Sequence, residues 1–218
     1  MGAESRPHPL RVPCILAAAA ALFFAVIALQ VGLGPTGPDV TFLRWLESLR
    51  NPRWTALMTG VTELGGTLGV ATVVVVVVVA LSLSQHQREA LFVLMANLGS
   101  ILITKAAKAA FARARPSSEI VTAIAEARSF SFPSGHALST MVLYGSLVIA
   151  AMAIGNRQAI RLSIVVAAVL VLGVGLSRCY LGVHYLSDVV AGWTLGFAWL
   201  SLMLLVQRWA LTRRMPPA

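Results

Sequence analysis

The sequence predicts an all-α integral membrane protein with six transmembrane helices and one short helix at the membrane interface. Two observations support this fold class. Of the 218 residues, 58% are hydrophobic and only 11% are charged, whereas soluble domains carry about 25% charged residues. Long apolar runs also recur along the chain, and several approach the roughly 20 residues that a helix needs to cross a bilayer. The length suits a single domain over residues 1–218.

The N-terminal part is expected to hold two membrane helices and the interfacial helix. Residues 1–12 form a polar tail, and the apolar run 13–34 predicts a first transmembrane helix, although a signal peptide shows the same basic-then-apolar pattern. Residues 39–50 place apolar side chains at helical spacing opposite charged ones, which predicts an amphipathic helix on the membrane surface; a solvated connector helix is the alternative. The run 64–87 carries no charge and predicts the second span.

Four further spans are predicted in the rest of the chain. Residues 90–104 are apolar for only fifteen residues, so this helix is expected to continue through Lys108 in order to cross a core of about 30 Å. A polar loop separates it from the next helix. The loop covers 116–133, the remaining spans cover 137–156, 162–177 and 189–207, and a second polar tail covers 208–218.

The charge balance narrows the class of partner. The formal net charge is +9, and such an excess often indicates nucleic-acid binding. Here the basic residues are scattered singly between apolar runs, so an anionic lipid or an anionic substrate is expected instead, and no nucleic acid. Cys14 and Cys179 are predicted at opposite membrane faces, which predicts no disulfide and no metal cluster.

Three polar clusters interrupt the apolar pattern, at Lys108–Pro116, Pro133–His136 and Arg178–Asp188. In a six-helix up-and-down arrangement, the end of the third helix, the start of the fourth, the end of the fifth and the start of the sixth lie at one membrane face. All three clusters are therefore predicted to meet on the same side. Ionisable groups at the edge of a membrane segment are functional candidates, because they are costly to place there.

The clusters supply three cations and the start of a helix, and each of these can bind a phosphate group. The forked donors of arginine match phosphate oxygens. The free N–H groups and the positive dipole end of a helix start attract an anion, and a glycine there allows close approach of the backbone. The cations are Lys108, Arg115 and Arg178, and the helix start is formed by Ser134 and Gly135.

Two histidines, His136 and His184, could supply a nucleophile and an acid. Asp188 follows His184 by four residues, a spacing that brings a carboxylate within reach of the imidazole. A carboxylate that holds one ring nitrogen leaves the other free to react. On this stretch alone, a satisfied interfacial histidine is an equally good interpretation. Because no group of Asp, Glu, His and Cys looks able to hold a metal, the side-chain cations are expected to neutralise the phosphate.

The three clusters together resemble a known signature. Lys108-x6-Arg115-Pro116, Pro133-Ser134-Gly135-His136 and Ser177-Arg178-x5-His184-x3-Asp188 are similar to the three-part signature of the type 2 phosphatidic acid phosphatase superfamily, above all its bacterial membrane lipid phosphatases with six helices. The resemblance covers about residues 50–207. It implies a phosphatase that needs no metal or cofactor and removes a terminal phosphate from a lipid phosphate or diphosphate, such as phosphatidic acid, phosphatidylglycerophosphate or a polyprenyl diphosphate.

The resemblance also implies a role for each motif residue. His184 attacks phosphorus and forms a phosphohistidine, Asp188 orients His184, and His136 protonates the leaving oxygen and then assists water. A covalent intermediate of this kind divides one difficult displacement into two easier ones. The residues implied to hold the phosphoryl oxygens are Lys108, Arg115, Ser134, Gly135 and Arg178.

Alternatives remain for the function and for several residues. A lipid phosphotransferase would share the first half-reaction, while an anion or lipid transporter fits less well because transporters place their polar residues at mid-membrane. Lys105 and Arg113 are interpreted as cations that reach the interface rather than as catalytic groups. Arg128 and Tyr180 could touch the substrate or simply lie in the loop.

The location is predicted from the basic residues and from the resemblance. Their numbers on the two sides are nearly equal, but the balance favours cytoplasmic termini once Lys108, Arg115 and Arg178 are set aside as phosphate ligands. The expected location is a bacterial inner (cytoplasmic) membrane with the site facing outward. Nothing in the sequence indicates the oligomeric state.

Overall fold

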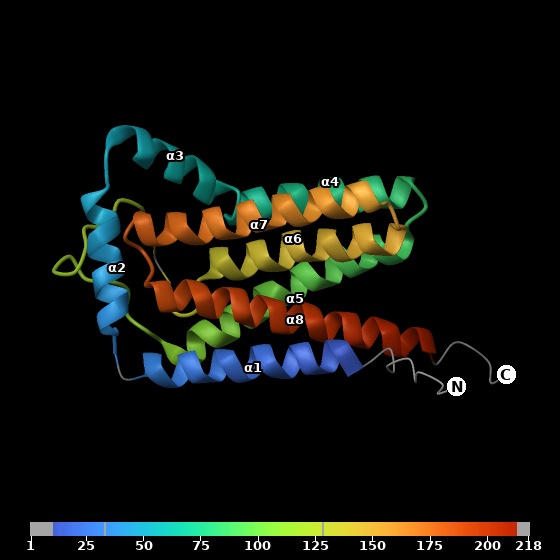
Figure 1. The fold of residues 1–218 in the computed structure, drawn as a ribbon, viewed down its shortest axis with the longest axis horizontal. Coiled ribbons are helices and arrows are strands. Elements are labelled where there is room, and N and C mark those ends of the chain that lie inside the picture. The colour runs from blue at the N-terminus through green and yellow to red at the C-terminus, as the bar shows by residue number, and fades with distance from the viewer. Residues whose placement is uncertain (1–10, 33, 128, 213–218) are drawn as a thin grey trace, which may run out of the picture.

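A computed structural model describes residues 11–32, 34–127 and 129–212, and all regular structure in these ranges is helical (Figure 1). The all-α prediction is therefore confirmed. The helices are α1 (Arg11–Val31), α2 (Gly37–Ser48), α3 (Pro52–Glu63), α4 (Thr67–Leu83), α5 (Gln87–Phe111), α6 (Gly135–Ile154), α7 (Arg157–Tyr180) and α8 (Leu186–Thr212).

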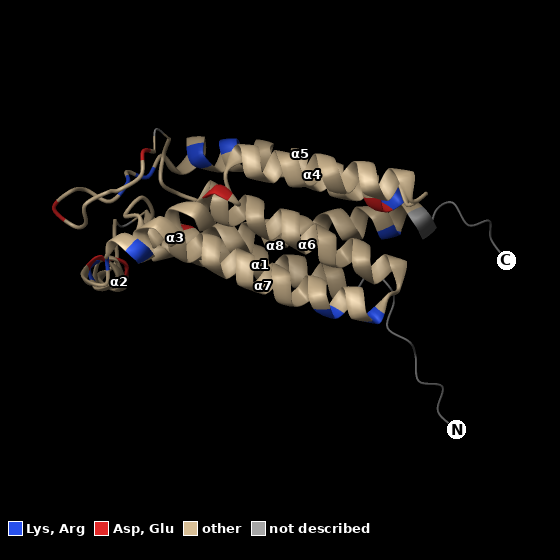
Figure 2. Cartoon of the chain, turned by 90° about the horizontal axis from the view of Figure 1, so that it is seen from above, with Lys and Arg blue, Asp and Glu red and all other residues tan. Residues whose placement is uncertain are grey.

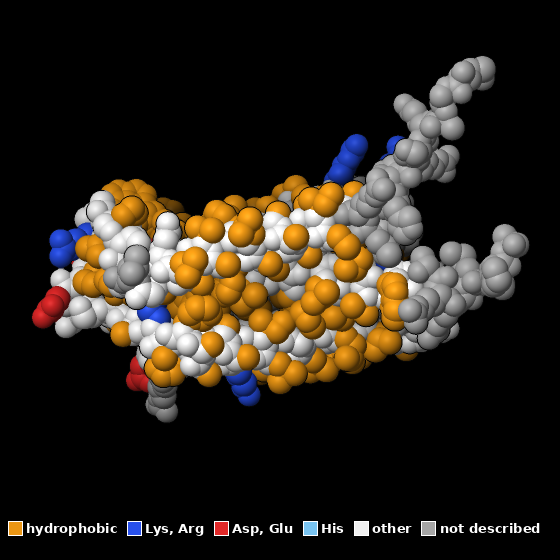
Figure 3. Space-filling view, turned by 90° about the horizontal axis from the view of Figure 1, so that it is seen from below, with side chains coloured by type: hydrophobic (Ala, Val, Ile, Leu, Met, Phe, Trp, Pro, Cys, Tyr) orange, Lys and Arg blue, Asp and Glu red, His pale blue; other side chains and the backbone are white. Residues whose placement is uncertain are grey.

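Five helices (α1, α5, α6, α7 and α8) are individually long and apolar enough to cross a membrane. α3 and α4 are long and apolar enough only when they are taken together as one broken span, with a bend of 49° between them, and this pair brings the number to six. The long helices run along the length of the molecule (Figure 1). α6 lies among them and packs on α5, α7 and α8, while α1 packs along α8. Charged residues gather toward the two ends (Figure 2), and hydrophobic side chains cover much of the surface between them, as lipid contact requires (Figure 3).

The second span differs from its prediction as a single helix over 64–87. Its straight part, α4, has 17 residues, and α3 was not predicted. The side chain of Asn51 accepts a hydrogen bond from Trp54 N at 3.0 Å and so caps α3, which then begins at Pro52. The break includes Gly65 and Gly66, and at Gly65 the chain passes so close to Val174 of α7 that a side chain does not fit.

The bounds of the other helices also move slightly. α1 begins at Arg11 and α8 continues to Thr212, so both helices include residues that were assigned to the polar tails. The rest of both tails, residues 1–10 and 213–218, lies outside the described residues. α1 belongs to the packed core, because its Phe24 stacks on Phe132 with ring centroids 5.7 Å apart, and Phe132 is fully buried.

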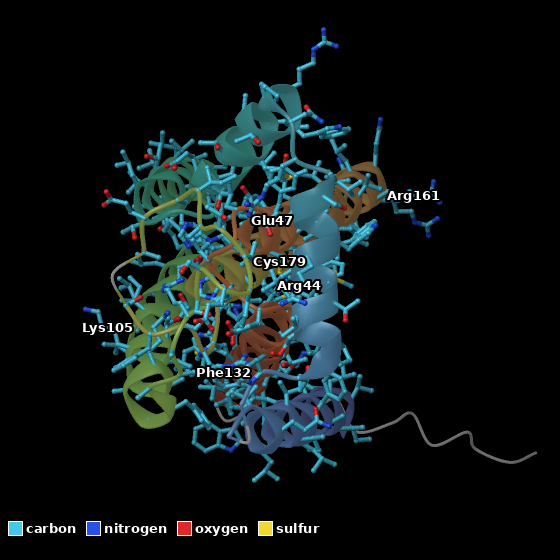
Figure 4. The ribbon with its side chains drawn as sticks, turned by 90° about the vertical axis from the view of Figure 1, so that its left-hand side faces the viewer. Arg44, Glu47, Lys105, Phe132, Arg161 and Cys179 are labelled. Carbon is cyan, nitrogen blue, oxygen red and sulfur yellow. The ribbon has the colours of Figure 1, made fainter. Side chains whose placement is uncertain are left out.

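The predicted interfacial helix is present as α2, which lies across the end of the bundle (Figures 1 and 4). It begins at Gly37 because Thr36 and Asp39 form a reciprocal capping box. Leu43 and Leu46 are buried against the bundle, whereas Trp45 on the outer side is exposed. α2 thus has the amphipathic character that the sequence predicted.

The ends of α5 and α7 and the starts of α6 and α8 all lie at the end of the bundle that α2 crosses (Figure 1). This is the arrangement that the six-helix topology predicted for the three motifs. The first residues of α1 and the last of α8 lie at the opposite end (Figure 1). Cys14 and Cys179 belong to opposite ends and are both free.

The break between α3 and α4 yields a prediction about stability. A Cβ atom at Gly65 would lie 2.4 Å from a methyl group of Val174 and 3.0 Å from one of Thr140. Gly65→Ala should therefore destabilise the protein by about 1–3 kcal/mol, the usual cost of overpacking a filled core. Thermal unfolding in detergent measures this loss. Gly60→Ala is the matched control, because a Cβ at Gly60 meets nothing within 4 Å; equal melting temperatures for the two variants would contradict the packing argument.

Candidate active site

The first motif is placed by the end of α5. Ala112 adopts a left-handed conformation with φ of 43°, which ends the helix and turns the chain back toward the bundle. Lys108, in the last turn of α5, donates a hydrogen bond to the carbonyl oxygen of Phe130. Arg115 donates to the carbonyl oxygen of Val183 at 2.5 Å. The two cations are thereby fixed to the segments that carry the second and third motifs.

The second motif forms the start of α6. Ser134 is the N-cap residue, and its backbone N–H donates to the carbonyl oxygen of Asp188 at 2.9 Å. Its hydroxyl is buried and has no hydrogen-bond partner among the described residues. A Cβ on Gly135 would lie 3.8 Å from the Cε atom of Lys108. The helix start therefore lies directly beside the cation from the first motif.

The third motif begins in the last turn of α7 and crosses to α8. Arg178 is buried, and its Nη1 donates to the hydroxyl of Thr62 in α3 at 2.9 Å. Its Nε is also buried, without a partner among the described residues. Gly182 then turns the chain with φ of +75°, a conformation that side chains rarely adopt.

His184 lies between a carboxylate and a guanidinium. Its Nδ1 is 3.4 Å from Oδ2 of Asp188, and its Nε2 is 3.3 Å from Nη1 of Arg115. Burial lowers the pKa of His184 to about 4; Asp188 opposes this shift, while two nearby arginine charges reinforce it. The ring is therefore neutral at physiological pH. With Nδ1–H directed at the carboxylate, Nε2 keeps its lone pair.

His136 lies against the break between α3 and α4. A Cβ on Gly66 would be 3.7 Å from His136 Nε2 and equally 3.7 Å from a carboxylate oxygen of Glu63. The broken span, which the sequence did not predict, thus forms one wall of the site. His136 is close enough to His184 and to the cations of the other motifs to interact electrostatically with them.

Asp188 is fully buried and accepts hydrogen bonds from several directions. Ser131 Oγ donates to it at 2.5 Å and the backbone N–H of Tyr185 at 3.0 Å, in addition to His184. Ser131 was not predicted as a site residue, because it lies outside the motif spacings. It immediately precedes the Phe132-Pro133 pair that leads into α6.

Arg113 corrects one interpretation made from the sequence. It does not reach the interface but is buried, with ion pairs to Asp188 at 2.5 Å and to Asp39 at 3.2 Å. The turn at Ala112 directs it back toward the bundle. Its partner Asp39 lies 74 residues earlier in the chain, so no local pattern could have indicated the pair. Lys105, in contrast, is exposed and points away from the bundle, as expected (Figure 4).

Tyr180 has a structural position. It is buried at the end of α7, its hydroxyl is 3.2 Å from that of Thr55, and its carbonyl oxygen accepts two hydrogen bonds from Arg50. These contacts fasten α3 and the link between α2 and α3 to the end of α7. Arg128, the other residue left open by the sequence, lies outside the described residues.

The arrangement can bind an anion and present an imidazole to it. Burial lowers the pKa of Arg115, with Asp188 opposing the shift, yet a guanidinium stays protonated in proteins. Among the described residues, no group of three or more His, Cys, Asp and Glu is placed to hold a metal ion. The chemistry available from the described side chains is therefore cationic binding of a tetrahedral anion next to two histidines.

This helical membrane fold, with cations and histidines gathered at one end, defines an integral membrane hydrolase of lipid phosphates. The chain belongs to the PAP2 superfamily, whose family model matches residues 89–211. It is 28% identical over 180 residues to phosphatidylglycerophosphatase B of Bacillus subtilis (strain 168), a match that covers 80% of this chain and 86% of that protein.

Two solved structures share the fold. One is a transmembrane PAP2 type phosphatidylglycerolphosphate phosphatase from Bacillus subtilis. Its TM-score is 0.77 and its identity is 26%, and the match covers 92% of this chain and 98% of that one. The other is Aquifex aeolicus LpxE, with a TM-score of 0.64 and 18% identity over 78% of this chain and 96% of that one. The family predicted from the three motifs and the membrane fold predicted from the composition and the apolar runs are both confirmed.

Proposed function

We propose that this protein removes a terminal phosphate from a membrane lipid phosphate or diphosphate through a phosphohistidine at His184. The position of the His184 ring supports this most directly. One ring nitrogen faces the carboxylate of Asp188 at 3.4 Å, and the other lies 3.3 Å from Arg115. A neutral imidazole held in this way directs its lone pair to the place where a guanidinium would hold a phosphate.

The phosphate would be held by residues from all three motifs. Ser134 Oγ and Arg178 Nε are buried without partners among the described residues, and buried polar groups normally have a hydrogen-bond partner. A bound phosphoryl group would satisfy both. Fixed cations would also stabilise the charge on the transferring group. The proposed phosphate ligands are Lys108, Arg115, Ser134, Gly135 and Arg178.

The reaction would proceed in two displacements. First, Nε2 of His184 forms a bond to phosphorus while the bond from phosphorus to the lipid oxygen breaks. His136, protonated beside the bound phosphate, gives that oxygen a proton and becomes neutral. Second, His136 takes a proton from water as the water oxygen attacks phosphorus. The P–N bond then breaks, which releases inorganic phosphate and restores neutral His184. Asp188 keeps the ring oriented throughout and offsets its positive charge.

We propose phosphatidylglycerophosphate as the first substrate to test, before phosphatidic acid and polyprenyl diphosphates. The name of the Bacillus subtilis relative and the description of the similar solved structure both specify this lipid. The position of the site also suits a lipid head group, because the three motifs lie at the end of the bundle beside the amphipathic helix α2 (Figures 1 and 4). Phosphate release from a panel of these lipids by purified protein distinguishes them, and addition of alternative acceptors distinguishes hydrolysis from phosphotransfer.

The two histidines should fail in different ways. His184→Ala should abolish both turnover and the labelled phosphoenzyme, because no other group is proposed to attack phosphorus. His136→Ala should slow lipid turnover by about 10²- to 10⁴-fold, the usual contribution of a general acid. It should still form the phosphoenzyme from an aryl phosphate, whose leaving group needs no proton. Rapid-quench trapping with labelled substrate measures both. Labelled phosphohistidine in the His184 variant would refute the assignment of the nucleophile.

Turnover should not depend on a divalent metal, because three side-chain cations are proposed to neutralise the phosphate. We expect full activity after dialysis against excess chelator, measured as phosphate release from the preferred lipid. A loss of activity that magnesium restores would overturn this mechanism. The same assay on Lys108→Ala serves as a positive control for loss of a phosphate ligand.

The site is proposed to face away from the cytoplasm in a bacterial inner membrane. A cysteine at Ser118, which is exposed near the site end, should react in intact cells with a thiol probe that cannot cross the membrane. The background is Cys14→Ser and Cys179→Ala. A cysteine at Ser84, exposed in the turn at the opposite end, is the control and should react only after the cells are opened. The reverse pattern would invert the orientation and make the substrate a lipid of the inner leaflet.

A further inference from the structure

A buried chain of charges lies behind His184 and extends to the interfacial helix. It runs from His184 to Asp188, then to Arg113, and ends at Asp39 near the start of α2. Only 2% of the surface of Asp39 is exposed, Arg113 is 9% exposed, and Asp188 is fully buried. Asp39 and Arg113 lie outside the three motif signatures. Even when they are paired, buried charges often stabilise a fold no better than apolar side chains of similar size, so their placement calls for a role.

Arg113 is fixed on three sides. Its Nη1 donates to Asp188 at 2.5 Å and to the hydroxyl of Ser187 at 2.9 Å, and its Nη2 donates to Asp39 at 3.2 Å. The guanidinium also lies over the ring of Tyr185, with its central carbon 4.2 Å from the ring centroid. The fork of the arginine therefore holds two carboxylates at once, which an ammonium group with its point charge does less well.

Asp39 is equally well held. One of its oxygens accepts from the backbone N–H of Ser187 at 2.9 Å, and the other accepts from the hydroxyl of Ser187 at 2.7 Å. The same carboxylate accepts from the backbone N–H of Thr36 in the capping box of α2. The start of α2 and the first turn of α8 are thus joined through one carboxylate.

We propose that Arg113 and Asp39 are positioning residues for the nucleophile, which fix the carboxylate of Asp188 and set the charge balance that His184 experiences. This inference rests on the proposed roles of His184 and Asp188. Within the described part of the chain, neither Arg113 nor Asp39 bonds to a proposed phosphate ligand. They should therefore affect the reactivity of the imidazole and not the binding of phosphate.

The charge balance gives the two residues opposite effects. The three charged groups Asp39, Arg113 and Asp188 together carry one net negative charge. Loss of the cation at Arg113 makes the surroundings of His184 more negative, which favours its protonated form. Loss of the carboxylate at Asp39 makes the surroundings of His184 more positive. Arg113 is then paired with Asp188 alone, which favours the neutral form of His184. Loss of both restores the original net charge.

Other charges also face His184, but they are unchanged in these variants. Arg115 in the loop after α5, Arg178 in α7 and His136 in α6 interact with His184 itself. Lys108 in α5 and Glu63 in α3 interact with these neighbours. Burial lowers the pKa of His184, so the neutral, reactive form persists as pH falls and is lost only near pH 4. The acidic side of the pH–rate profile therefore reports the charge that His184 experiences.

The test measures kcat/KM for an aryl phosphate against pH in purified variants and compares the acid limb, the pH range over which kcat/KM falls as pH is lowered. The ionisation of the substrate is the same for all variants, so a difference in the limb comes from the protein. We expect Arg113→Gln to move the limb to higher pH, Asp39→Asn to move it to lower pH, and the double variant to return it close to the wild type. kcat should fall by up to about 10²-fold in Arg113→Gln, the loss expected for a misplacement of about 1 Å. The inhibition constant for inorganic phosphate should stay within about twofold.

Two further variants keep the test decisive. Arg113→Lys retains the charge without the fork, so kcat should fall while the limb stays in place. Glu47→Gln removes the other carboxylate of α2, which pairs with Arg50 instead, and should leave the limb unmoved. If Arg113→Gln does not fold, Asp39→Asn and the double variant carry the comparison. Limb shifts in the same direction for Arg113→Gln and Asp39→Asn, or no shift in Asp39→Asn, would overturn the inference.

The outcome can be separated from a failure of the proposed function. If His184→Ala retains the labelled phosphoenzyme, the nucleophile has been wrongly assigned, and the proposed function fails first. If His184→Ala forms no phosphoenzyme and the opposite limb shifts are still absent, His184 keeps its role. Arg113 and Asp39 would then serve only the stability of the fold.

Discussion

The pairing of one buried carboxylate holds the site together. The side chain of Asp188 accepts hydrogen bonds from Arg113, Ser131 and His184, and its carbonyl oxygen accepts from the backbone N–H of Ser134. These contacts join the segment of the first motif, the start of α6 and the start of α8. Because an unpaired charge inside a membrane protein is costly, the three segments must pack together for Asp188 to be buried at all.

The site has two layers that differ in what they bond to. The layer that is proposed to bind phosphate keeps buried donors without a partner among the described residues, such as the hydroxyl of Ser134 and Nε of Arg178. The layer beneath it, around Asp188 and Asp39, satisfies its carboxylates within the protein. Free donors suit a group that must bind and leave, whereas saturated carboxylates suit a rigid support.

The sequence predicted those parts that depend on local spacing. Apolar runs indicated the spans, and the three motifs indicated the residues that meet at one end. The break at Gly65 and Gly66 was missed because it accompanies a tertiary contact, the close approach of Val174 from α7 to Gly65, which no periodicity records. The pairing of Asp39 with Arg113 was missed for the same reason, since only the folded chain brings α2 beside the end of α5.

The dependence of the motifs on α3 has a consequence for modularity. A fragment that begins at α5 would contain every residue of the three signature motifs. It would still lack Thr62, the hydroxyl that accepts from Arg178, and the glycine pair that lies against His136. The buried guanidinium of Arg178 would lose its partner, and His136 would lose the segment that packs against it. The catalytic unit is therefore larger than its signature, and transplanting the motifs alone onto another helical bundle would transfer the chemical groups without their support.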